Sequence, residues 1–177
     1  MSESADVILA DERGRAVLRF ERTLPNPPEQ VWGALTDPMK LTAWHPSPFE
    51  AEPMVGGTVT YVSQGDDPTM PDGEVIEYEP PRVLAHTWGE DLLRWEIRPH
   101  DEGCLLVLTH TFDDRLKAAR DAAGWHLCLD ALASALDHAG PAPPEDAGPI
   151  PEGWPELNAA YEQRFGIDPE EATPPPE

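Results

Sequence analysis

The sequence predicts an α+β fold in which a curved antiparallel β-sheet wraps around a long C-terminal α-helix. The first observation is the helix itself, residues 121–139, where one apolar stripe lies opposite a polar side that includes His126 and Asp130. The second is a series of short alternating apolar and polar stretches upstream, joined by turn residues, which is typical of an antiparallel meander. The sheet gives the stripe a surface to pack against; the stripe consists of Trp125, Cys128, Leu129, Leu132 and Leu136.

The composition indicates a small, acidic protein with one folded domain. A chain of 177 residues suits a single domain plus a tail. The net charge of −22 at pH 7 argues against nucleic acid or an anionic membrane as a partner, because both bind basic surfaces. We attribute the charge to solubility. The N-terminal stretch lacks the apolar core of a signal peptide, and no apolar run reaches about 18 residues, so we expect a cytoplasmic protein.

The N-terminal part is expected to contain one strand and two short helices. Residues 1–14 are expected to form a polar lead-in with weak structure. Residues 16–24 alternate as in a half-buried strand, which the prolines after it end. Asn26 is a candidate N-cap for a short helix that runs to about Leu35, and a second short helix is expected over residues 39–44.

Several more strands are expected before the long helix. They are separated by Gly, Pro and Asp residues typical of tight turns. The helix should end at Gly140 and Pro141, because Gly accepts the left-handed cap conformation and Pro cannot continue a helix. The strand stretches read TVTYVS, EVIEYE, RVLAHTW, LLRWEIR and CLLVLTHTF.

After residue 140 the composition changes to that of a linker and tail. Residues 141–153 are expected to form a proline-rich linker. Residues 154–166 are expected to form a short amphipathic helix, because Trp154, Leu157, Tyr161 and Phe165 recur at helical spacing. Residues 167–177 are acidic and rich in proline, and we expect a disordered tail there.

Five segments together resemble a known superfamily. They read RFERTLPNPPEQVWGALTDPMKLTAWHP, GGTV, GEVIEYEPPRVLAHTWG, LRWEIRPHDEGCLLVLTHTF and AGWHLCLDALASAL. In combination they are similar to the SRPBCC superfamily, also called START-like or Bet v 1-like. Within it they resemble the branch named after the C-terminal domain of the heat-shock-protein-90 ATPase activator. The resemblance covers about residues 15–140, which we take as the domain.

The resemblance implies a helix-grip fold, with two short helices after the first strand and an elongated cavity between the sheet and the long helix. It raises the expectation of ligand binding without naming a ligand, since superfamily members bind lipids, hormones or polyketides and some are cyclases or hydrolases. The chaperone activator carries a further N-terminal domain that 14 lead-in residues do not accommodate. We therefore do not expect full ATPase activation.

Strand alternation gives a candidate wall for this cavity, mostly apolar with a few polar groups. Such a wall suits a flat hydrophobic ligand held by stacking and one or two hydrogen bonds; a filled core with the same residues is the alternative. The two histidines in the wall serve either a ligand or the core as hydrogen-bonding groups. The candidate residues are Val59, Tyr61, His86, Trp88, Leu93, Trp95, Leu106, Leu108, His110, Trp125, Leu129 and Leu132.

No pattern in the sequence predicts a metal site, a cofactor or a catalytic nucleophile. The histidines form no HxH or HExxH pair, and GxSxG is absent. Cys104 and Cys128 lack metal-type spacing and are expected to be reduced, buried thiols. We therefore predict no catalytic residue, no metal and no cofactor.

Three functions are compatible with the sequence. The first, which we favour, is non-catalytic binding of a small hydrophobic molecule. The second is a cyclase or hydrolase acting on an aromatic or polyketide-like substrate, which needs His86 or His110 within hydrogen-bond reach of a second polar group. The third is a co-chaperone or protein-interaction module, which an exposed stripe on helix 154–166 would support. A homodimer and a chaperone or other protein partner both stay open.

Overall fold

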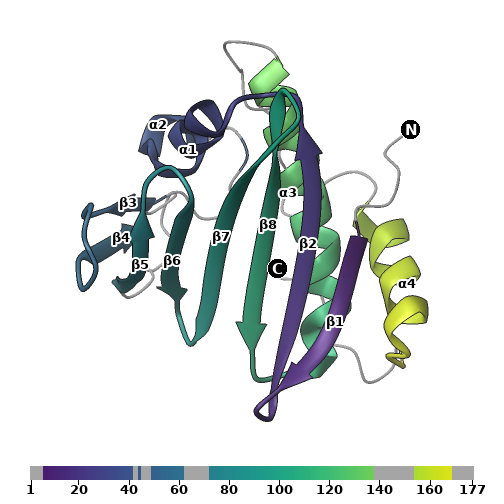
Figure 1. The fold of residues 1–177 in the computed structure, drawn as a ribbon. Coiled ribbons are helices and arrows are strands. Elements are labelled where there is room, and N and C mark those ends of the chain that lie inside the picture. The colour runs from purple at the N-terminus through teal and green to yellow at the C-terminus, as the bar shows by residue number, and fades with distance from the viewer. Residues whose placement is uncertain (1–5, 42–43, 45–48, 62–71, 138–153, 169–177) are drawn as a thin grey trace.

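The computed structural model describes residues 6–41, 44, 49–61, 72–137 and 154–168. Within them, eight strands form one antiparallel sheet in the order β1-β2-β8-β7-β6-β5-β4-β3 (Figure 1). The strands are β1 (Asp6–Glu12), β2 (Arg15–Leu24), β3 (Phe49–Ala51), β4 (Thr58–Tyr61), β5 (Gly73–Glu79), β6 (Val83–Trp88), β7 (Asp91–His100) and β8 (Gly103–Phe112). The helices are α1 (Pro28–Thr36), α2 (Pro38–Leu41), the 3-10 turn η1 (Arg115–Lys117), α3 (Ala118–Asp137) and α4 (Trp154–Phe165).

The long helix α3 lies across one face of the sheet, and the core fills the space between them (Figure 1). Alternation along the central strands directs every second side chain to this face, as in Leu93 and Trp95 of β7 and Leu106 and Leu108 of β8. All four side chains are buried. The predicted helix-grip α+β fold is confirmed.

A strand occupies most of the stretch expected to be a lead-in with weak structure. β1 pairs with β2 along its whole length, from Asp6 opposite Glu21 to Glu12 opposite Arg15. The two-residue loop between them, Arg13 and Gly14, has positive φ at both positions, which suits a tight hairpin. A strand therefore occupies residues 6–12 of the expected lead-in, and the two short helices follow the second strand rather than the first.

The segment after β2 differs from the prediction in three details. The N-cap of α1 is Pro27, with no side-chain cap, while the Asn26 amide donates instead to the Leu136 carbonyl at 3.4 Å. α2 ends at Leu41 rather than at residue 44. The three-residue strand β3, too short to show alternation, was not expected.

The helices near the C-terminal end agree closely with the predicted ranges. α3 begins three residues earlier than expected, directly after η1, which Asp114 caps by accepting a hydrogen bond from the Leu116 amide. α4 ends at Phe165, and Gly166 adopts the positive φ expected of a cap residue. Ile167 is buried and donates to the Glu162 carbonyl, so the folded part extends beyond residue 166.

α4 packs against α3 on the side that the sequence suggests is exposed to solvent. His126 of α3 is largely covered there, and its Nδ1 lies 2.9 Å from the Tyr161 hydroxyl of α4. His126 therefore lies on the polar side of α3 without being surrounded by solvent, because α4 covers it. The expected linker, residues 141–153, and nearly all of the expected tail, residues 169–177, lie outside the described residues.

In the part of the chain that the structure describes, no helix combines the length and the apolar character needed to cross a membrane. Cys104 and Cys128 are free thiols, and Cys104 is buried as expected, whereas Cys128 is half-buried. Burial raises the pKa of the Cys128 thiol to about 12 and also raises that of Cys104.

Gly103 should be sensitive to the smallest enlargement. A Cβ atom at this position would overlap the Leu24 carbonyl oxygen and lie 2.9 Å from the Pro25 Cα, both of which are backbone atoms. We expect Gly103→Ala to lower the free energy of unfolding by about 1–3 kcal/mol, because the backbone of β2 or β8 must shift. Urea titration monitored by tryptophan fluorescence measures the change.

Gly124 of α3 provides the matched control, since a Cβ there meets no atom within 4 Å. Gly124→Ala should raise the free energy of unfolding by about 0.5–1 kcal/mol, because alanine favours the helix interior. Equal effects of the two substitutions would contradict the assigned packing.

Candidate functional site

The twelve predicted wall residues all lie on the side of the sheet that faces α3, or on α3 itself. Eleven are buried, and Trp88 is half-buried. Their rings contact one another: the ring centroids of Trp88 and Trp95 are each 5.6 Å from that of Trp125. The nine strand residues therefore have the predicted inward parity, and the three helix residues lie on the predicted stripe of α3. Whether this group opens to hold a ligand stays a prediction.

The two histidines in the wall belong to separate clusters. His86 of β6 lies beside Phe49 and Tyr61 of the short strands β3 and β4, with a ring-centroid distance of 4.5 Å to Phe49. His110 of β8 lies instead between Trp88, Phe112 and Trp125. The difference matters because the two imidazoles have different hydrogen-bond partners.

His110 has partners on both ring nitrogens. The indole Nε1 of Trp125 donates to its Nδ1 at 3.0 Å, so Nδ1 is an acceptor and the proton of the neutral ring is on Nε2. Nε2 in turn donates to Asp91 Oδ2 at 2.8 Å. The chain Trp125–His110–Asp91 therefore connects α3 to β8 and β7 by two directional hydrogen bonds.

Asp91 is the charged end of this chain. Burial alone raises its pKa, but the hydrogen bonds from His110 and Lys117 and the positive charge of Lys117 outweigh burial and hold the pKa below its usual value. The Lys117 ammonium lies 3.1 Å from Oδ2. Asp91 is consequently a carboxylate at neutral pH, held in place by two elements.

Asp121 of α3 lies next to this pair, and together the three side chains form a group that metals sometimes use. Ligand atoms of Asp91, His110 and Asp121 lie within 4.8 Å of one another. The protonated Nε2 of His110 cannot bind a metal while Trp125 occupies Nδ1, and Lys117 already supplies a positive charge to Asp91. The geometry favours an ion-pair and hydrogen-bond network over a metal centre.

Asp121 itself is an unusual acid. Burial raises its pKa above the ordinary value of an aspartate, despite the opposing effects of His110, Arg120 and Lys117. Its carboxylate lies 3.1 Å from Arg120 Nε.

His86 has a partner on only one ring nitrogen. Its Nδ1 lies 3.2 Å from the Tyr61 hydroxyl and 3.3 Å from the Thr87 carbonyl oxygen. Since Tyr61 donates its own proton to that carbonyl, Nδ1 carries the ring proton and Nε2 is a bare acceptor. Nε2 is buried and has no hydrogen-bond partner among the described residues. Burial lowers the pKa of His86 to about 4, so the ring is neutral at pH 7.

The sequence reasoning missed Asp91, Lys117 and Asp121. Asp91 follows Gly89 and Glu90 and so looks like an exposed turn residue, yet it has the same strand parity as Leu93 and Trp95. Extending the alternation of β7 backwards by one step places Asp91 on the buried face. Lys117 and Asp121 carry no comparable signal, because their positions depend on where η1 gives way to α3.

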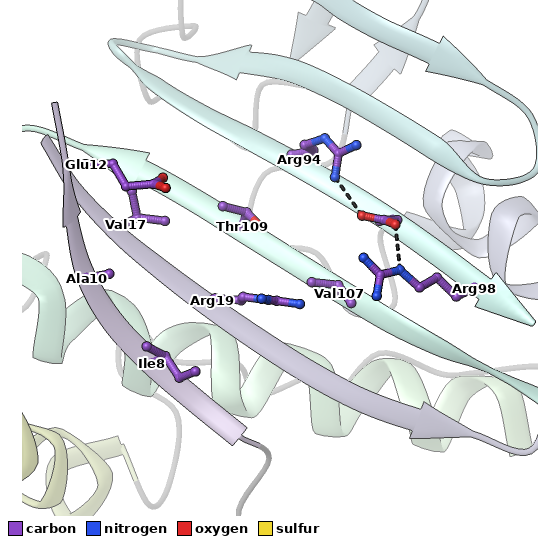
Figure 2. Close-up of a pocket in the computed structure, with 10 residues that line it drawn as sticks. Ile8, Ala10, Glu12, Val17, Arg19, Arg94, Arg98, Val107 and Thr109 are labelled. Atoms are coloured by element: carbon purple, nitrogen blue, oxygen red, sulfur yellow. Dashed lines mark hydrogen bonds and ion pairs between the residues drawn. The ribbon is translucent and has the colours of Figure 1, made fainter. Parts of the chain in front are cut away.

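A shallow groove of about 390 Å³ lies on the opposite face of the sheet, away from α3. Val17 and Val107 form part of its floor, and arginine and glutamate side chains flank it (Figure 2). Arg94 and Arg98 both donate to Glu96, as the dashed lines in Figure 2 show, and Arg94 also donates to Glu77. The polar groups of this groove therefore largely satisfy one another.

Residues 25–137 match the family model described as activator of Hsp90 ATPase homolog 1-like protein. This match covers more than half of the chain and includes both histidine clusters. The chain belongs to this family. The resemblance to the activator branch of the SRPBCC superfamily is thereby confirmed. No curated protein matches the chain.

Solved structures with this fold include proteins from several bacteria. One is a conserved protein of unknown function from Enterococcus faecalis, with 21% identity over 91% of each chain and a TM-score of 0.73. CalU16 from Micromonospora echinospora is 19% identical over 93% of this chain and 99% of its own, with a TM-score of 0.68. DynU16, a protein in the dynemicin biosynthetic locus, is 26% identical over 71% of this chain and 48% of its own, with a TM-score of 0.60.

His110→Phe should be more damaging than His86→Phe, although both histidines are fully buried. The first change removes the acceptor of the Trp125 indole and one partner of the Asp91 carboxylate, and we expect a loss of about 1–3 kcal/mol in unfolding free energy. The second also removes a buried acceptor that has no partner, which offsets the loss of the Nδ1 contact. Urea denaturation of both variants tests the order, and an equal loss would refute the assigned roles.

The buried His86 should make folding pH-dependent. Its pKa is near 6.5 in the unfolded chain and about 4 in the folded protein, so the unfolded state binds the extra proton between these values. Stability is therefore complete above pH 6.5 and is lost as the pH falls towards 4. Between pH 7 and pH 4.5, the free energy of unfolding of His86→Leu should therefore fall by about 2–3 kcal/mol less than that of the wild type.

The control for this comparison is His100→Leu, because the His100 side chain is 53% exposed. Its unfolding free energy should follow the wild-type pH dependence. The assignment fails if His86→Leu shows the wild-type slope as well.

Proposed function

We propose that the protein binds a small hydrophobic molecule carrying a hydrogen-bond donor, between the sheet and α3, and does not chemically change it. The observation that carries this proposal is the bare, buried Nε2 of His86. A buried acceptor without a partner costs about 1–3 kcal/mol, and a ligand hydroxyl or N–H group would satisfy it. The Phe49 and Tyr61 rings next to the imidazole suit an aromatic ligand.

The strands around His86 are those that can open at least cost. Among the described residues, β3 and β4 have three and four residues, and β4 pairs with β5 at two positions. They form the edge of the sheet, where few hydrogen bonds oppose a local movement. Because His86 has no exposed surface, a ligand reaches Nε2 only when side chains of this region move aside.

The comparisons agree with ligand binding at a general level. The family is built on the helix-grip fold, and DynU16, a protein in a biosynthetic locus, shares that fold. Membership in the family supports a binding role but not a particular molecule.

The catalytic alternative requires a histidine within hydrogen-bond reach of a second polar group, and both His86 and His110 meet this condition. Both nitrogens of His110 are engaged, so neither is available to take a proton from a substrate or give one to it. Burial lowers the pKa of His86 to about 4, which makes its Nε2 a weak base at neutral pH. The co-chaperone alternative loses the support that an exposed α4 would have given, because Tyr161 of α4 is buried against α3.

The test compares 2-naphthol, which donates a hydrogen bond, with 2-methoxynaphthalene, which only accepts one. Titration followed by tryptophan fluorescence should show that wild type binds 2-naphthol about two- to tenfold more tightly, the range expected for one hydrogen bond. In His86→Leu this preference should disappear, while His100→Leu should retain it. Recovery of unchanged 2-naphthol after incubation would support binding without turnover.

Three results would overturn the proposal: no binding of either compound by wild type, equal affinity for both, or a preference that survives in His86→Leu.

A further inference from the structure

The buried guanidinium of Arg22 is the strongest feature outside the site described so far. Arg22 lies on β2 with the same parity as Phe20 and Leu24, so it points to the side of α3, and its side chain is only 15% exposed. Its Nη1 donates to Asp130 Oδ1 of α3 at 2.6 Å. Its Nε and Nη2 are buried and have no hydrogen-bond partner among the described residues.

These two nitrogens form one edge of the guanidinium. Their N–H bonds on that edge are parallel, which is the geometry that binds the two oxygens of a carboxylate at once. Burying donors of a charged group without a partner is costly, more so than for a neutral donor. The chemistry of the edge therefore calls for an anion with two oxygens.

In four other arginines of the protein, the Nε atom already has a carboxylate partner. Nε donates to a carboxylate in Arg15, Arg94, Arg98 and Arg120, with the partners Asp113, Glu77, Glu96 and Asp121 respectively. Figure 2 shows the Arg98 pair. Arg22 differs because its carboxylate partner, Asp130, occupies Nη1 and leaves the Nε–Nη2 edge open.

The net charge of the chain does not oppose an anion at Arg22, because distant acidic residues act weakly at physiological ionic strength, where the screening length is about 8 Å. Apart from Arg22 itself, the charged groups acting on the nearby Tyr161 hydroxyl are one cation, Arg164, and one anion, Asp130.

The niche around Arg22 is bounded by three elements. β2 supplies Arg22, α3 supplies Asp130 and His126, and α4 supplies Tyr161, whose hydroxyl bonds to His126. β1 begins at Asp6, opposite Glu21, so no described residue of β1 lies beside Arg22. Because Nε and Nη2 of Arg22 are buried, a ligand reaches them only when neighbouring side chains move aside, and the Tyr161 ring favours an aromatic ligand.

We propose that Arg22 binds the carboxylate of a small aromatic acid through Nε and Nη2, in the niche between β2, α3 and α4. The site is distinct from the His86 region. Arg22 lies beside Leu106 of β8. His86 is two strands away from β8, and its row across the sheet runs through Leu93 of β7 and reaches β8 at His110, four residues beyond Leu106.

The experiment uses benzoate and its neutral analogue benzamide, each titrated at pH 7 with the ionic strength held constant by sodium chloride. The ¹⁵Nε–¹H signal of Arg22 in the wild-type protein should shift on addition of benzoate and not of benzamide. Binding of benzoate, followed by the same titration or by the thermal midpoint, should weaken at least tenfold in Arg22→Lys, which retains the charge but lacks the two-nitrogen edge.

Arg19→Lys is the matched control, because Arg19 lies on the same strand but on the opposite face, paired with Glu21. It should bind benzoate as wild type does. The proposal is overturned if the Arg22 signal does not respond to saturating benzoate, which would mean that water alone satisfies the edge, or if benzamide produces the same shift. Should Arg22→Lys fail to fold, the wild-type signal with the two probes still decides between these outcomes.

Discussion

The hydrogen bond from the Trp125 indole to His110 fixes how the long helix lies on the sheet. An indole N–H buried this deeply needs an acceptor, and His110 Nδ1 is placed to provide it. That acceptor requires one tautomer of the imidazole, and Asp91 stabilises the same tautomer from the other side. The position of α3, the start of β7 and the aromatic centre of the core therefore depend on a single proton arrangement.

The same reasoning separates two histidines that look alike in the sequence. Both lie on strands, have inward parity and are fully buried. His110 contacts the Trp125 indole at Nδ1 and the Asp91 carboxylate at Nε2. His86 contacts the Tyr61 hydroxyl and the Thr87 carbonyl, both at Nδ1. Both nitrogens of His110 are thus engaged, whereas Nε2 of His86 has no partner among the described residues.

Periodicity predicted most of the fold because alternation and the helical stripe record which side chains are buried. It placed all twelve wall residues on the correct face. It missed β1, whose polar residues at Asp11 and Glu12 hide the inward pair Val7 and Leu9, and it missed β3, which is too short to alternate. It could not show that His126 is covered, because the polar side of a helix gives no sign that a second helix packs on it. Pairs such as His110 and Asp91 depend on strand register and tautomer, which no local pattern encodes.

The extent of the packed unit has a consequence for how this domain can be inherited. The family model covers residues 25–137, yet β1 and β2 precede that range and α4 follows it. β2 is the partner of β8 over nine residue pairs, and α4 covers the back of α3. A recombination event that moved only residues 25–137 would split the sheet between β2 and β8. The segments on both sides must therefore travel with the matched range if the packed unit is to stay whole.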